Sequence, residues 1–107
     1  MKVDLFSEAL GFANVDILLL HDWPDLMNQA RDETWPSHWV DIGSEHFSLL
    51  VETIAPKYVF CGHMHRAALH KFRQIEIICL SDFHRERENS CVLLDTEAGR
   101  YEWPLKI

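Results

Sequence analysis

With 107 residues, 48% of them hydrophobic, and no biased tract, the chain predicts one folded domain with a modest core and excludes a disordered protein. Its formal net charge of -7 disfavours a nucleic-acid partner held mainly by charge. The longest apolar run is far too short to cross a bilayer, and the acidic residues near the N-terminus are not expected in a signal peptide.

The first half of the chain predicts a strand, a helix and a second strand. Residues 5–13 predict a short helix, and residues 15–20 predict a strand whose near-continuous apolar character is typical of a strand covered on both faces. Residues 24–43 predict a long loop with one helical turn. A further helix is expected after Ser44, a favoured N-cap, with Ala55-Pro56 as its end, and residues 57–61 predict the next strand. This order is a βαβ crossover.

The second half predicts consecutive strands. Residues 67–72, 75–80, 91–95 and 100–103 have the composition of strands, and residues 96–99 predict a hairpin turn between the last two. The whole chain therefore predicts an α/β fold, in which a βαβ unit is followed by mostly antiparallel strands.

Three histidines follow the two strands of the crossover. His21 comes directly after the first strand, and His63 and His65 come after the second, behind a glycine that is expected to turn the chain sharply. Parallel strands end at the same edge of a sheet, where ligand sites of open α/β sheets lie. The sequence thus predicts that the three imidazoles meet, and imidazole suits Zn, Fe or Mn. Taken singly, each histidine would more often be a plain polar strand end.

The two histidine segments resemble the last two signatures of the calcineurin-like metallophosphoesterases. Gly62-His63-Met64-His65 after an apolar strand matches the final Gly-His-x-His signature, and His21 after an earlier apolar strand matches the one before it. Residues 21–24, His-Asp-Trp-Pro, further resemble the RNA lariat debranching branch. The resemblance covers residues 13–82.

This resemblance implies a fold, a reaction and a set of ligands. The fold would be the C-terminal half of an αββα sandwich, with residues 1–107 forming a partial domain. His21 and His63 would bind one divalent ion and His65 the other, the ions being Mn, Fe or Zn. The two ions would clamp a phosphate mono- or diester while hydroxide attacks phosphorus in line.

The earlier signatures of the family do not occur ahead of His21, where the family has them. Asp-x-His, Gly-Asp-x-x-Asp and Gly-Asn-His-Asp/Glu are all missing from that segment, so no bridging carboxylate and no catalytic residue can be assigned. Two adjacent dications would then repel each other strongly. We therefore expect a chain that is inactive alone and is completed by a polypeptide carrying the missing half or by self-association.

Two further residues are candidates for supporting roles. Asp22 adjoins His21 and is a candidate acceptor that orients an imidazole, although a solvent-exposed loop carboxylate is equally consistent with its position. Arg85 is a candidate phosphate ligand, but the alternating charges of residues 85–88 are also typical of a self-compensating surface loop.

Two other functions remain open from the sequence. The chain could be a metallophosphoesterase-fold scaffold without catalysis, although a scaffold has no need of three histidine ligands. It could also be a small zinc protein in which His21, His63 and His65 bind a single ion. Three cysteines with no CxxC pair leave an odd thiol, which predicts reduced thiols and a cytoplasmic protein.

Overall fold

The computed structural model describes residues 15–105 as a mixed α/β fold, so the helix expected at residues 5–13 lies outside the described part. Within this range, no helix combines the length and the apolar character of a bilayer-spanning segment. The elements, in chain order, are β1 (Ile17–Leu20), the 3-10 helix η1 (Asp25–Ala30), α2 (Glu45–Ile54), β2 (Tyr58–Cys61), β3 (Ala68–Phe72), β4 (Ile75–Cys79), the 3-10 helix η2 (Arg87–Asn89), β5 (Leu93–Asp95) and β6 (Arg100–Glu102).

Helix α2 begins and ends where its sequence predicts. The Ser44 hydroxyl accepts a hydrogen bond from the Phe47 N–H at 3.3 Å, which satisfies one of the free donors of the first turn. Ala55 adopts a left-handed conformation with φ 50°, and its N–H donates to the Val51 carbonyl at 2.8 Å before Pro56 prevents continuation. The confirmed helix supplies the crossover between β1 and β2.

The strands form a four-stranded sheet in the order β1-β2-β4-β3 and a separate β5–β6 pair. β1 and β2 are parallel, as the crossover predicts. β3 and β4 form an antiparallel hairpin through a tight turn in which Arg73 has φ 57°. The second strand of this hairpin, β4, pairs with β2, and it does so in parallel. Three strands of the sheet therefore end at one edge.

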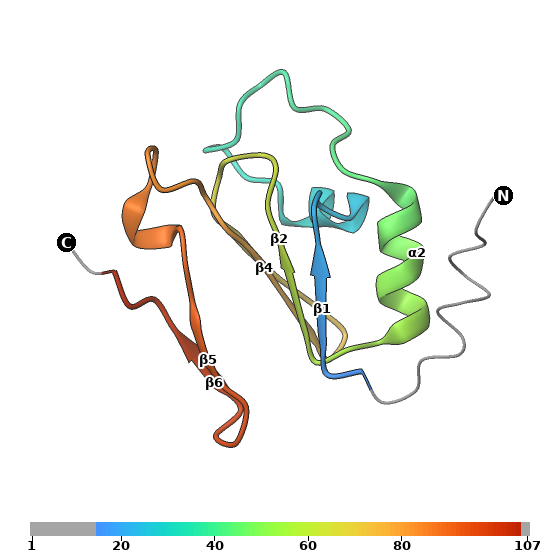
Figure 1. Ribbon diagram of the computed structural model, residues 1–107. Coiled ribbons are helices and arrows are strands. Elements are labelled where there is room, and N and C mark those ends of the chain that lie inside the picture. The colour runs from blue at the N-terminus through green and yellow to red at the C-terminus, as the bar shows by residue number, and fades with distance from the viewer. Residues whose placement is uncertain (1–14, 106–107) are drawn as a thin grey trace, which may run out of the picture.

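One face of the sheet carries the core. Its strand residues are Leu18, Leu20, Val59, Cys61, Ile77 and Cys79, and they belong to the same apolar cluster as Trp23, Met27 and Val51. Met27 and Val51 are fully buried, and each such burial stabilises the fold by roughly 1.5–3 kcal/mol. Figure 1 shows α2 on this side of the sheet and the β5–β6 hairpin on the other.

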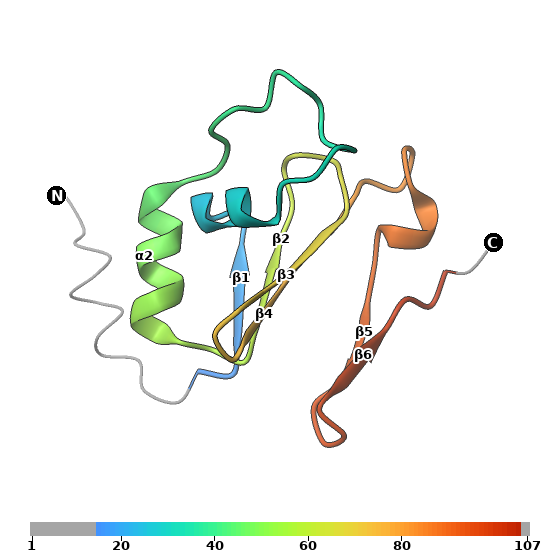
Figure 2. The ribbon, with the colours of Figure 1, turned by 180° about the vertical axis from the view of Figure 1, so that it is seen from behind.

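The opposite face is only partly covered. Tyr101 of β6 contacts Tyr58 of β2 with ring centres 6.4 Å apart, so the hairpin screens part of this face. At the margin, β1 is an edge strand, and Leu19 on it is 73% exposed. The expectation that this strand is covered on both faces is therefore wrong within residues 15–105, because Ile17 and Leu19 on its outer face are 37% and 73% exposed. Figure 2, the view from behind, shows β3 at the other edge.

Candidate functional site

The candidate site lies where β1, β2 and β4 end. His21 follows β1 directly, the Gly62-His63-Met64-His65 loop follows β2, and Asp82 comes three residues after β4. Because all three strands are parallel, their carboxyl ends share one edge. The crossover therefore brings the segments that carry the three histidines to one edge of the sheet.

Two of the histidines, His21 and His63, lie close to each other. Their ring centres lie 5.1 Å apart with the planes tilted by 53°. Two imidazoles that bind one tetrahedral ion at about 2.0–2.1 Å place their ring centres roughly 5 Å apart, so this spacing is compatible with a shared ion. Both side chains belong to exposed residues, so an ion could reach them from solvent.

The histidine loop has an unusual backbone. His63 and His65 have φ values of 74° and 56°, a region that residues with side chains rarely adopt. The Met64 N–H donates to the Gly62 carbonyl at 2.9 Å and closes a three-residue turn around His63. Each such conformation costs of order 1–3 kcal/mol and is common at ligand sites. The sharp turn is therefore made by the histidines and not by Gly62, whose φ is not positive.

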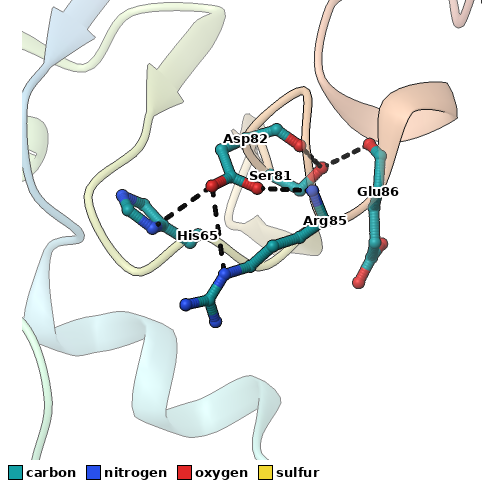
Figure 3. A network of polar contacts seen from close by, with 5 residues as sticks. All are labelled: His65, Ser81, Asp82, Arg85 and Glu86. Carbon is teal, nitrogen blue, oxygen red and sulfur yellow. Dashed lines mark hydrogen bonds and ion pairs between the residues drawn. The ribbon is translucent and has the colours of Figure 1, made fainter.

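His65 is directed toward a carboxylate. Its Nδ1 lies 3.5 Å from Oδ2 of Asp82, and the Arg85 Nε approaches the same oxygen at 3.9 Å (Figure 3). The Arg85 backbone N–H donates to Asp82 Oδ1 at 2.8 Å, and the Ser81 hydroxyl donates to the Glu86 carbonyl at 2.6 Å. A carboxylate beside Nδ1 can orient an imidazole so that Nε2 is available as a ligand.

Asp82 is the residue that sequence reasoning did not assign to the site. Its position after an apolar strand was the available signal, since the same position selected His21. Its relevance depends on β4 running parallel to β2, which brings Asp82 to the histidine edge.

Asp22 and Arg85, the two candidates for supporting roles, each have a protein contact in the structure. The Asp22 carboxylate accepts the Trp23 N–H at 2.7 Å, so its described hydrogen bond goes to the backbone and not to an imidazole. Arg85 is exposed and folds back onto Asp82. Through this contact it lies at the same edge of the sheet as His65.

A shallow hollow of about 380 Å³ lies beside the histidines. Its polar lining includes His63, His65 and Asp82. Its apolar lining comes from strand ends, chiefly Leu19, Phe60 and Leu80. Ligand pockets in proteins are commonly of this size and combine apolar walls with a few polar groups.

Within residues 15–105, no three side chains of His, Cys, Asp or Glu surround a common point as metal ligands. The described donor set is thus one close imidazole pair, His21 with His63, and a third imidazole, His65, directed to Asp82. Such nitrogen donors fit Zn, Mn or Fe better than Mg or Ca.

No protein-family model matches the chain, and no curated protein sequence matches it. The likeness to the calcineurin-like metallophosphoesterases therefore depends on the His21 and Gly62-His63-Met64-His65 segments and on where they lie in the fold.

Proposed function

We propose that this chain carries the histidine ligands of a metal-dependent phosphoesterase centre and forms the C-terminal half of an αββα sandwich. The observation that carries this proposal is the approach of His21 to His63, 5.1 Å between ring centres, across two parallel strand ends. These two residues are the ones that the family resemblance assigns to a single ion. The position of His65 next to them, with its Nδ1 near Asp82, supports a second ligand position.

Each residue has a defined part in the proposed centre. His21 and His63 would hold one divalent ion, and His65, oriented by Asp82, would bind a second. Divalent ions polarise a phosphoryl oxygen and stabilise the charge that develops on the attacking and leaving oxygens. Arg85 would contact a phosphate oxygen from the side of Asp82. The bridging carboxylate would come from a polypeptide segment outside this sequence.

The proposal predicts weak binding of at most about one transition-metal ion by the isolated chain. Three imidazoles without a bridging carboxylate bind one zinc ion modestly and do not neutralise two. Titration with zinc, followed by a competing chelator of known affinity, should give one site, and the double substitution His63→Ala/His65→Ala should weaken binding by at least about tenfold.

Two matched variants sharpen this experiment. His84→Ala removes an exposed imidazole outside the histidine loop and should leave the affinity unchanged. Asp82→Asn should lower it, by up to about tenfold, because the imidazole of His65 loses its orienting charge. Two tightly held ions per chain, or unchanged binding in the double variant, would contradict the proposal.

We also expect little or no hydrolysis of a chromogenic phosphodiester by the isolated chain in the presence of manganese. The reason is chemical: among the described residues no three His, Cys, Asp or Glu side chains form a group that could hold a metal ion, so a two-metal centre is not assembled by residues 15–105 alone. The measurement is the release of nitrophenolate with and without metal. A metal-dependent rate well above background that His65→Ala abolishes would show that the histidine half is sufficient.

A single-ion zinc protein is the second candidate, and the spacing of His21 and His63 favours it equally. The two candidates differ in their response to a partner. A phosphoesterase half gains a second ion and activity when a polypeptide supplies the carboxylates, whereas a mononuclear zinc protein keeps one ion under all conditions.

A further inference from the structure

Two of the cysteines face each other beneath the candidate site. Cys61 ends β2 and Cys79 ends β4, and the two are paired residues in the parallel ladder. Their sulfurs lie 2.8 Å apart, and both cysteines are free thiols. Their side chains are 3% and 0% exposed. The third thiol, Cys91, is only half-buried and belongs to neither strand.

The backbone already has the geometry that a disulfide needs. Neighbouring strands lie about 4.8 Å apart, which is within the Cα separation of roughly 4.4–6.8 Å found in disulfides. The side chains of paired residues project from the same face, so the sulfurs approach each other without a change in register. A bond of about 2.05 Å requires each sulfur to move by only a few tenths of an ångström.

The two thiols differ in access. Cys61 lines the hollow beside His63 and His65, whereas Cys79 does not. Burial, followed by the hydrogen bond with Cys61 and the nearby charges of Cys61 and Asp22, raises the pKa of the Cys79 thiol. Cys79 therefore stays protonated, and Cys61, at 3% exposure against 0% for Cys79, is the thiol that a small reagent reaches first.

We propose that Cys61 and Cys79 are an oxidisable pair that a small peroxide converts to a disulfide linking β2 to β4. The Cys61 thiolate attacks the peroxide, breaks its O–O bond and becomes a sulfenic acid, releasing hydroxide that takes up a proton to form water. The Cys79 sulfur then displaces the sulfenic oxygen, which leaves as water with the Cys79 proton, and the S–S bond forms. Two thiols are oxidised and one peroxide is reduced to water.

The disulfide would link the end of β2, which leads into the histidine loop, to the end of β4, which leads to Asp82. The histidine loop starts directly after Cys61, and Asp82 lies three residues beyond Cys79. The Leu80 N–H already donates to the Cys61 carbonyl at 2.9 Å, so the strand ends are held in register. Oxidation would add a covalent link to this hydrogen bond and stiffen the edge that carries His65 and Asp82.

The test uses the full chain with Cys91→Ser, which removes the competing thiol. After treatment with hydrogen peroxide, the chain is unfolded, alkylated and weighed. We expect a mass lower by about 2 Da, no alkylation at Cys61 or Cys79, and full recovery of both thiols with dithiothreitol. The Tm of the oxidised chain should be higher than that of the reduced chain by at least about 5 °C, because a bridge of this loop length limits the unfolded state.

The matched control adds Cys79→Ala to the same background. Without its partner, Cys61 should accumulate as a sulfenic acid that dimedone traps, with no loss of 2 Da. The pair is refuted if both thiols of the parent remain open to alkylation after peroxide has labelled the control. It is equally refuted if dimedone traps Cys61 in the parent to the same extent as in the control. Neither result depends on metal binding, so the outcome is independent of the proposed phosphoesterase function.

Discussion

The substitution Gly43→Ala is expected to destabilise the fold by more than about 3 kcal/mol, a large share of the stability of a domain of this size. Gly43 has φ 86°, which costs an alanine about 1–2 kcal/mol. An added Cβ would also lie 2.7 Å from the Trp23 carbonyl oxygen and 2.9 Å from the Pro24 carbonyl carbon and oxygen. These are backbone atoms, so they cannot rotate away as a flexible side chain would.

The close approach of Gly43 to the backbone of Trp23 and Pro24 matters because it joins two segments that are distant in the sequence. The Ser44 N–H donates to the Trp23 carbonyl at 2.8 Å, and the Asp25 N–H donates to the Ser44 carbonyl at 3.0 Å. These bonds fix the start of α2 against η1, next to the point where the chain leaves β1 and His21. A displaced Trp23 carbonyl would break the first of them and shift a fully buried indole.

Gly99→Ala is the matched control. Gly99 also has a positive φ, 67°, but an added Cβ would meet nothing within 4 Å. We expect a loss of about 1 kcal/mol from backbone strain alone. Urea unfolding followed by circular dichroism measures both variants. Equal losses in the two would show that the close approach at Gly43 relaxes at no cost.

Much of the secondary structure could be predicted because local signals and tertiary packing agree. Ser44 and Ala55-Pro56 bound α2 as expected, and all strand segments between residues 15 and 103 form strands with ends trimmed by one or two residues. The parallel pairing of β1 with β2 followed from the crossover rule. The neighbour of β2 was not predictable, because a hairpin can present either of its strands to the sheet.

The candidate site was predictable only in part. The parallel crossover accounts for bringing His21 near His63. The contact of His65 with Asp82 depends on the placement of β4, so the sequence could not supply it. His63 and His65 have positive φ values, which residues with side chains rarely adopt. The sequence instead predicted that Gly62 makes the turn. The positive φ values require tertiary context that no local pattern contains.

The unpaired edge of β1 is expected to make the isolated chain self-associate. This strand pairs with β2 on one side only, so within the described residues its outer N–H and C=O groups have no strand partner. Its sequence, Ile-Leu-Leu-Leu, contains none of the charges or prolines with which proteins protect a sheet edge. Ile17 and Leu19 project from one face and are 37% and 73% exposed. Apolar edges of this kind recruit another strand.

We therefore expect the isolated chain to self-associate or aggregate, with Leu19→Lys shifting it toward the monomer. In light scattering coupled to size-exclusion chromatography, the wild-type mass should exceed 12.6 kDa and rise with concentration. A lysine at residue 19 places a charge on the strand edge, which opposes pairing with a second strand. The same substitution at Leu49, which is 48% exposed on α2, adds the same charge away from any strand and should leave the mass unchanged. A wild-type monomer that melts cooperatively would mean that the described sheet closes its own core. An equal response to Leu49→Lys would mean that net charge, and not the β1 edge, controls association.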